Sequence, residues 1–268
     1  RKRYNATNGQ EGAFVVAVNC SWGITGGQPT DAPLWCAAFD SLGAAGILSV
    51  AATANSPVNV DSVGDLPTAC PSDYLISVTS LGNTDLKADN AAWGATMIDL
   101  GAYGKDVFTA RSGNSYGTVN GTSFAAPQVS GAIGLLYAAP CNNLIERAKV
   151  NPAAAALWAK ERLLETTVPV AALNAITVTG GRLDLYNLLQ EYEDQCTDCI
   201  PPFALRAEFT SANTMRVQWS AVSNVQSVGL RWRKQGDVTW NLVPGAVSPL
   251  LLTGLLPCTG YEISLRAG

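Results

Sequence analysis

Two apolar runs of strand length, separated by one amphipathic segment, most constrain the fold of this chain. Residues 13–23 (AFVVAVNCSWG) and residues 47–55 (ILSVAATAN) are mostly apolar and end in small or polar residues. Such runs are typical of strands buried on both faces of a parallel sheet. Between them, residues 31–46 carry apolar side chains at helical spacing, with Asp31 as a candidate cap. This order predicts an α/β fold with a mostly parallel sheet flanked by helices.

Later segments extend this pattern. Residues 74–81 (YLISVTSL) predict a third buried strand, and residues 95–113 predict two short strands around GAYGK. Helices are expected to begin near Ser123 and to span residues 151–167 and residues 180–195. Helices of this length are suited to covering the faces of such a sheet.

The sequence pattern changes at CTDCIPPF. Beyond it, short alternating segments separated by turn residues replace the helical patterns, which is typical of a small β-sandwich. We therefore predict two domains: residues 1–197 with the α/β fold, and residues 201–268 with an all-β sandwich.

Composition excludes some partners. The 268 residues have a net charge of −4 and contain no basic run, which argues against a nucleic-acid partner. No apolar run approaches the roughly 18 residues of a membrane span, so we expect no transmembrane segment. Seven cysteines favour a secreted protein with disulfides, although buried thiols in a cytosolic protein are the alternative. Because seven is odd, at least one cysteine is free or pairs outside the chain.

The segment GTVNGTSFAAPQVSGAIGLLYAA, residues 117–139, contains the candidate nucleophile. Its small-residue turn places Ser123 on the first turn of an expected helix, where backbone N–H groups favour developing negative charge. A serine that only caps the helix is the alternative interpretation. A serine nucleophile needs a base, and the chain contains no histidine.

Gly121-Thr122-Ser123-Phe124-Ala125-Ala126-Pro127 resembles the nucleophile motif of subtilisin-like serine proteases, or subtilases. Two earlier segments match the family in the same order. Ser21-Trp22-Gly23 resembles a Ser-x-Gly segment, and Ala52-Thr53-Ala54-Asn55 resembles Ala-Ala-Gly-Asn. The loop with Pro67 and Ala69, followed by residues 74–78, resembles the segment that closes the far wall of the pocket. The resemblance covers residues 13 to about 140, with family-like helices to about 195, and implies a subtilisin-like fold.

The resemblance also implies roles for these residues. Ser123 is the expected nucleophile, and Asn55 with the Ser123 amide is expected to hold the oxyanion. The expected substrate-binding residues are Ser21, Trp22, Gly23, Ala52, Thr53 and Ala54. The small side chains at 52 and 54 leave room in the pocket for a fairly large substrate side chain. Trp22 either narrows this pocket or lines it.

The sequence departs from the family pattern at Gln128 and in lacking the catalytic histidine. Gln128 replaces the histidine that usually follows the motif's proline, a structural position. The catalytic Asp and His of subtilases precede the Ser-x-Gly segment. We therefore expect an N-terminally incomplete catalytic domain that needs an upstream segment of the same protease and is inactive alone. The glutamate-dependent sedolisin pattern does not fit, because Glu11 lies in the wrong loop.

Acyl transfer of this kind requires no cofactor, and no residues are assigned to a metal. Calcium is possible, since Asp61, Asp65 and Asp73 lie close together in sequence. The alternative is an ordinary solvated acidic loop, because this spacing is not that of a recognised calcium loop.

The second domain resembles a fibronectin type III module that is incomplete at its C-terminal end. Trp219 matches the core tryptophan, and residues 255–261 (LLPCTGY) resemble Leu-x-Pro-x-Thr-x-Tyr, whose tyrosine makes a corner hydrogen bond. The fold alone does not indicate a function for this domain.

Together, these features predict a secreted or cell-surface bacterial serine endopeptidase, acting outside the cell on polypeptides through an acyl-enzyme on Ser123. A catalytically inactive subtilase-fold scaffold with an extracellular binding or structural role is the alternative. A third possibility is one piece of a nicked protease that stays attached to its N-terminal piece.

Overall fold

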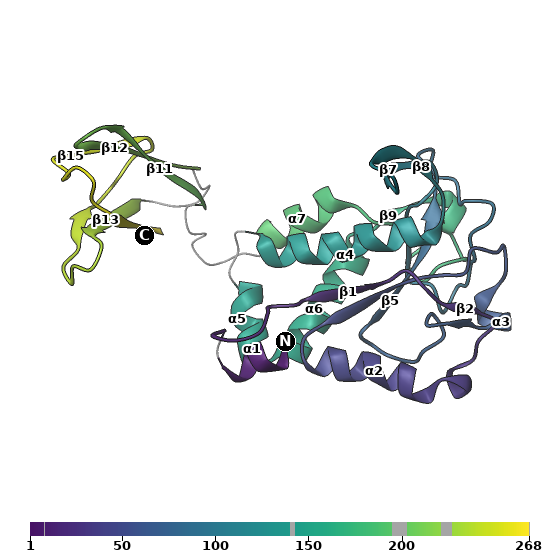
Figure 1. Ribbon diagram of the computed structural model, residues 1–268. Helices are drawn as coiled ribbons and strands as arrows, with labels where there is room; N and C mark the ends of the chain where they lie inside the picture. Colours follow the sequence, from purple (N-terminus) through teal and green to yellow (C-terminus); the bar gives the residue numbers. More distant parts are fainter. Residues whose placement is uncertain (8, 140–142, 195–202, 221–226, 268) are drawn as a thin grey trace. The chain divides into compact units, whose positions relative to one another are not determined.

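The computed structural model describes residues 1–7, 9–139, 143–194, 203–220 and 227–267 (Figure 1). They divide into two compact units. The first consists of Arg1–Ala139 and Leu144–Glu193, and the second contains the described residues from 203 onward. The predicted boundary, between residues 197 and 201, lies outside the described residues.

A six-stranded sheet forms the centre of the first unit. Its order is β1 (Ala17–Cys20), β3 (Leu48–Ala52), β5 (Leu75–Leu81), β6 (Leu100–Tyr103), β10 (Gly181–Arg182) and β9 (Val168–Pro169). Neighbouring strands from β1 to β10 run parallel, and β9 alone pairs antiparallel. Every residue of β3 and β5 is buried, as their apolar sequences predict. The mostly parallel sheet is confirmed.

Helices cover both faces of this sheet. The longer helices are α2 (Pro33–Ala44), α4 (Thr122–Ala138), α6 (Pro152–Glu165) and α7 (Leu185–Asp194), and the shorter ones are α1 (Lys2–Ala6), α3 (Val60–Val63) and α5 (Asn143–Val150). α4 packs against β1, β3, β5 and β6, whereas α2 packs against β3 and α6. Figure 1 shows α4 and α2 on opposite sides of the sheet.

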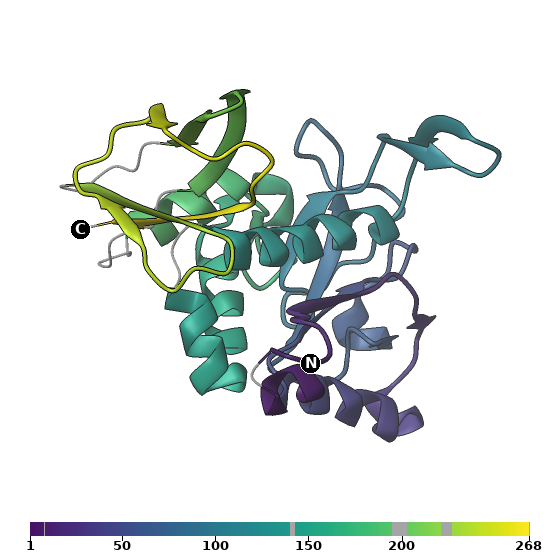
Figure 2. The same cartoon turned by 60° about the vertical axis from the view of Figure 1, so that its left-hand side comes forward.

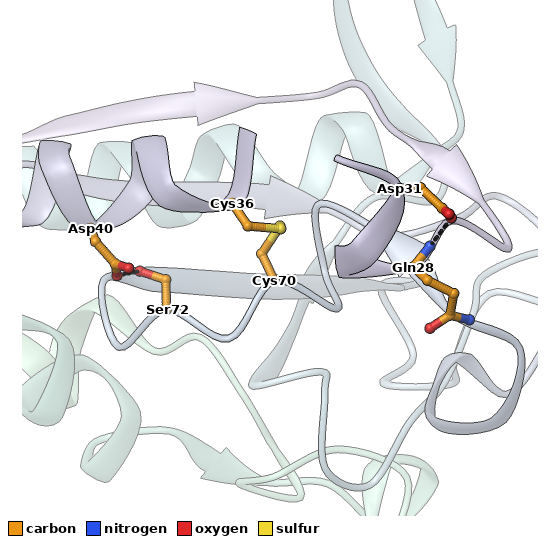
Figure 3. Close-up of a disulfide and its surroundings, with 6 residues drawn as sticks. All are labelled: Gln28, Asp31, Cys36, Asp40, Cys70 and Ser72. Carbon is orange, nitrogen blue, oxygen red and sulfur yellow. Dashed lines mark hydrogen bonds between the residues drawn. A yellow bond between two sulfur atoms is a disulfide. The ribbon is translucent and has the colours of Figure 1, made fainter. Parts of the chain in front are cut away.

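Two helices begin later than the sequence indicates. α2 begins at Pro33, so Asp31 is not its cap. The Asp31 carboxylate closes the preceding 3-10 turn (Pro29–Asp31), accepting a 2.8 Å hydrogen bond from the Gln28 N–H (Figure 3). α7 begins at Leu185 rather than at residue 180, because Gly181 and Arg182 form β10.

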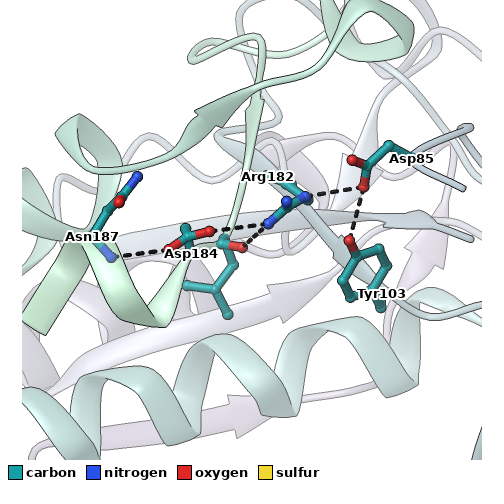
Figure 4. Close-up of polar contacts among 6 residues, drawn as sticks. Asp85, Tyr103, Arg182, Asp184 and Asn187 are labelled. Atoms are coloured by element: carbon teal, nitrogen blue, oxygen red, sulfur yellow. Dashed lines mark hydrogen bonds and ion pairs between the residues drawn. The ribbon is translucent and has the colours of Figure 1, made fainter. Parts of the chain in front are cut away.

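Polar contacts at the start of α7 explain its position. Asp184 accepts a 2.9 Å hydrogen bond from the Asn187 N–H, as an N-cap does. Arg182 forms ion pairs with Asp184 at 3.3 Å and with Asp85 at 3.0 Å, and the Tyr103 hydroxyl donates to the same Asp85 oxygen (Figure 4). These contacts hold the last part of the first unit against β6.

A disulfide between Cys36 and Cys70 joins α2 to the loop that follows β4 (Asp65–Leu66). Next to it, the Ser72 hydroxyl donates a 2.7 Å hydrogen bond to Asp40 of α2 (Figure 3). The expected disulfide chemistry is therefore present. Cys20 is a buried free thiol and Cys258 an exposed one, while Cys141, Cys196 and Cys199 lie outside the described residues.

Two small antiparallel pairs accompany the main sheet. β2 (Ile24–Thr25) pairs with β4, and β7 (Val107–Arg111) pairs with β8 (Ser115–Val119). The β7–β8 hairpin leads into α4 and projects from the sheet in Figure 2. The sequence predicted β7 but not β8.

The second unit contains two three-stranded antiparallel sheets. They are β11 (Phe203–Ser211), β12 (Thr214–Ser220) and β15 (Leu250–Thr253), and β14 (Asn241–Val243), β13 (Val228–Lys234) and β16 (Tyr261–Ala267). Residues of both sheets, including Trp219 and Leu230, form one hydrophobic cluster. Within the part of the chain that the structure describes, no helix is long and apolar enough to cross a membrane.

Candidate active site

A cavity of about 290 Å³ lies at the carboxyl ends of β1 and β3, where parallel sheets commonly bind ligands. Its lining residues are Ser21, Trp22, Gly23, Thr25, Ala52, Thr53, Ala54, Asn55, Ser56, Asp65 and Ser123. The structure brings together all the residues that the sequence suggested as catalytic or substrate-binding. The roles assigned to them remain predictions. Thr25, Ser56 and Asp65 were not predicted as part of this pocket.

Ser123 is the second residue of α4. It follows the N-cap Gly121, whose φ of 147° favours glycine. Its N–H is one of the four at a helix N-terminus that lack an intrahelical acceptor. Its hydroxyl makes no hydrogen bond with the residues that the structure describes. Ser123 therefore offers both an unengaged hydroxyl and an unengaged amide at the cavity.

Asn55 is held through its side-chain oxygen. The Asn55 Oδ1 accepts a 2.9 Å hydrogen bond from the Thr122 N–H and a 3.2 Å hydrogen bond from the Thr122 hydroxyl. Thr122 is fully buried, and its single hydroxyl hydrogen is shared between Asn55 Oδ1 and the Thr53 carbonyl. The Asn55 amide group has no acceptor among the described residues, so its N–H donors remain available at the cavity.

The end of β1 is attached to α4 by a chain of side-chain hydrogen bonds. Ser21 donates to the Ser123 carbonyl at 2.9 Å, and Asn19 donates to the Ser21 hydroxyl at 2.8 Å. Ser130 of α4 donates to Asn19 at 3.3 Å. These contacts fix the position of the Ser123 backbone relative to the cavity wall.

Gly23 and Trp22 shape the same wall. A Cβ atom at Gly23 would lie 2.3 Å from the carbonyl oxygen of Leu66, so only glycine allows β2 and β4 to approach this closely. Trp22 is half exposed and stacks on Trp35 of α2, with ring centroids 4.6 Å apart. Trp22 therefore lines the cavity, which the sequence left undecided.

Asp65 is the ionisable residue among the three pocket residues that sequence reasoning missed. Its side chain is buried, and its Oδ2 accepts hydrogen bonds from the Ala54 N–H at 2.9 Å and from the Thr68 hydroxyl at 3.1 Å. Burial raises the pKa of Asp65 to about 6, although both hydrogen bonds act to lower it. The available signal was its position two residues before Pro67, in the segment expected to close the pocket. Residues 74–78, expected in the same wall, are not among the lining residues.

The three acids that made calcium a possibility, Asp61, Asp65 and Asp73, do not form a metal-binding group in the described structure. Asp61 accepts hydrogen bonds from the N–H groups of Thr96 and Met97, whereas Asp65 lines the cavity. Among the residues that the structure describes, no group of three or more His, Cys, Asp or Glu side chains is placed to hold a metal ion.

An available serine hydroxyl that shares a cavity with an amide donor, at the carboxyl ends of parallel strands, is compatible with the nucleophile and oxyanion-donor part of a serine hydrolase site. The family model "Subtilase family" (Peptidase S8) matches residues 5–175, more than half of the chain. The chain therefore belongs to the subtilase family of serine proteases.

Individual relatives agree with this assignment. The chain is 30% identical over 165 residues to an intracellular serine protease of Paenibacillus polymyxa, a match that takes in 62% of this chain. That match covers 48% of the relative, so the chain spans about half its length.

Solved structures show the same fold. The prenylagaramide maturation protease PagA and the self-cleaved protease domain of PatA each superpose with a TM-score of 0.53 at 22% identity. The superpositions cover 71% and 72% of this chain, and 65% of each of the other chains. The subtilisin-like α/β fold is thus established for the first unit.

Proposed function

We propose that this chain is the serine-bearing part of a subtilisin-like endopeptidase that cleaves polypeptides through an acyl-enzyme on Ser123. The observation that carries the proposal is the pairing of an available Ser123 hydroxyl with available N–H donors of Asn55 and Ser123 in one cavity. In the proposed reaction, Ser123 Oγ attacks the substrate carbonyl carbon while a base takes its proton. The oxyanion that forms accepts hydrogen bonds from Asn55 and the Ser123 N–H.

The base is proposed to be a histidine on an upstream segment of the same protease, oriented by an aspartate there. The chain contains no histidine, and no glutamate is among the residues that line the cavity. Asp65 lines it, but its carboxylate is engaged by the Ala54 N–H and the Thr68 hydroxyl, and we assign it no part in proton transfer. Among the described strands, β1 pairs only with β3, which leaves one edge of β1 available to such a segment. We accordingly propose that the chain alone is inactive.

We further propose that the protease acts outside the bacterial cell or on its surface. The Cys36–Cys70 disulfide supports an oxidising compartment. The reaction as proposed uses only side chains and backbone amides, and therefore requires no cofactor. If calcium binds, its site is a structural one, and Asp61 already has its carboxylate engaged by two backbone N–H groups.

For residues 203–267 we propose a fibronectin type III-like module. Support comes from the shared core of the two antiparallel sheets, and from a 2.7 Å hydrogen bond that Leu256 N–H donates to the Tyr261 hydroxyl. This bond corresponds to the expected tyrosine corner. We propose no catalytic part for this module.

Fluorophosphonate labelling tests the proposed activity. The chain joined to its upstream segment should form a covalent adduct at Ser123, located by peptide mapping, and a Ser123→Ala variant should form none. The chain alone should react far more slowly, because it lacks the base. A folded, joined protein that is not labelled would contradict the proposal and favour the inactive scaffold.

A further inference from the structure

The charge of the active-site cavity is set by one residue. Asp65 is the only charged side chain among the residues that line it, and its side chain is almost completely buried, with 2% relative exposure. Its Oδ2 is engaged by Ala54 and Thr68. Its other oxygen, Oδ1, accepts no hydrogen bond from the residues that the structure describes.

A buried carboxylate without a cationic partner is energetically unfavourable, because water solvates the ionised form better than the protein interior does. No lysine or arginine in the described chain forms an ion pair with Asp65. The two groups that donate hydrogen bonds to its carboxylate, the Ala54 N–H and the Thr68 hydroxyl, are both uncharged. A cationic group that enters the cavity would supply the missing positive charge.

We propose that Asp65 makes the pocket specific for a cationic side chain, arginine or lysine, at the substrate residue whose carbonyl is attacked. This inference rests on the proposed function, because it assigns the substrate class of the same site. Asp65 would accept hydrogen bonds and balance the substrate's charge through Oδ1, a charge-assisted interaction that neutral side chains do not offer.

The walls of the cavity fit such a side chain. Ala52, Ala54 and Gly23 project little or no side chain into it, which leaves room for a long substrate side chain. Trp22 offers an indole ring, and stacking on Trp35 fixes its orientation. Cations bind favourably against the face of a tryptophan, so Trp22 and Asp65 favour the same kind of ligand.

The loop that bears Asp65 is firmly held. The Cys36–Cys70 disulfide and the Ser72–Asp40 hydrogen bond attach its continuation to α2 (Figure 3). On its other side, β4 pairs with β2, directly after Gly23. A carboxylate held from both sides meets the requirement that a recognition group be positioned before the substrate arrives.

The test uses the chain joined to its upstream segment and peptide substrates that differ only at the residue before the cut. Arginine, its neutral isostere citrulline, and leucine are compared by kcat/KM. We expect cleavage after arginine to exceed cleavage after citrulline by roughly 10- to 100-fold, the usual range for a hydrogen bond to a charged group. In Asp65→Asn this ratio should approach one. Asp73→Asn, an exposed acid of the same loop, should keep the wild-type ratio.

Two results would overturn the inference while leaving the proposed function intact. One is wild-type protease that cleaves after leucine in preference to arginine. The other is an Asp65→Asn variant that retains the arginine-to-citrulline ratio, which would reduce Asp65 to a structural acceptor for Ala54 and Thr68.

A binding measurement keeps the inference testable if no peptide is cleaved. The cation p-aminobenzamidine should bind the wild-type protein, and its fluorescence measures the binding. It should bind Asp65→Asn at least tenfold more weakly. Binding with this difference, but without any Ser123 labelling, would refute the proposed catalysis and support the cationic pocket. A lack of binding to folded wild-type protein would refute the pocket.

Discussion

Two groups of residues share the active-site cavity but are held there in different ways. The proposed reaction group, Ser123 and Asn55, is neutral and is fixed by hydrogen bonds to backbone and to Thr122. The recognition group, Asp65 and Trp22, consists of a buried negative charge and a stacked aromatic ring. Neutral donors remain available at little cost, whereas an unpaired buried charge is costly. The reaction group should therefore act on any peptide bond, and the recognition group should select among them.

Removing the nucleophile should have the largest effect. In the chain joined to its upstream segment, Ser123→Ala should lower kcat by about 10⁶-fold, the size of loss for the equivalent change in subtilisin, a member of the same family. The loss should be equal for arginine, citrulline and leucine substrates, because the change affects the reaction group alone. A loss confined to one substrate would show that the two groups are not separable.

Removing the oxyanion donor should have the next largest effect. Asn55→Leu removes the amide donor without adding a charge to the cavity, and it also removes the oxygen that accepts from the Thr122 N–H. We expect kcat to fall by roughly 10² to 10³, with KM little changed and the substrate ratio retained. Steady-state kinetics with the three substrates measures this effect. A thermal melt serves as the control, since a large drop in melting temperature would mean that Asn55 mainly stabilises the start of α4.

The charge of Asp65 should lower stability above its pKa. An aspartate titrates near 3.8 in the unfolded chain and near 6 at this site, so the folded state binds the proton more tightly. The stability contributed by the raised pKa is present below pH 3.8 and is lost as the pH rises to about 6. The difference corresponds to about 3 kcal/mol, an effect of about 10² on the unfolding equilibrium.

Denaturant unfolding tests this at several pH values. The free energy of unfolding of Asp65→Asn, relative to wild type, should rise between pH 4 and pH 6 and then level off. The same comparison for Asp73→Asn should vary little over this range. A flat profile for Asp65→Asn would show that Asp65 is not kept in an unfavourable ionised state.

The smallest expected effect is on selectivity as the pH falls. Below about pH 6 Asp65 gains a proton, so the ratio of kcat/KM for arginine over citrulline should decline about tenfold per pH unit until the preference is lost. Taking the ratio cancels the titration of the catalytic base, which affects both substrates equally. A ratio that stays constant from pH 8 to pH 5 would show that the charge of Asp65 does not determine the selectivity.

Much of the fold and of the reaction group was predictable because their signals are local. Continuous apolar runs identify β3 and β5, and the GTS segment places Ser123 at a helix start. The prediction for α7 was wrong at its start, since glycines 180 and 181 resembled a helix entry whereas Asp184 makes the cap. A capping contact and a strand of two residues produce no hydrophobic periodicity from which the start of α7 could be predicted.

The recognition group depends on contacts between distant residues. Asp65 reaches the cavity because β4 pairs with β2, about forty residues earlier, and each of these strands has only two residues. In the sequence alone, nothing distinguishes Asp65 from the nearby acids Asp61 and Asp73. The pairing of Cys36 with Cys70 was likewise not deducible among seven cysteines.

The Cys36–Cys70 disulfide also has a topological consequence. The covalent ring that it closes contains β3, Asn55 and Asp65, and so includes part of both the reaction group and the recognition group. A single backbone cut anywhere between residues 37 and 69 opens this ring without dividing the chain into two molecules. For a protein proposed to be a protease, self-cleavage in the exposed part of this loop would leave the fragments covalently attached until the disulfide is reduced.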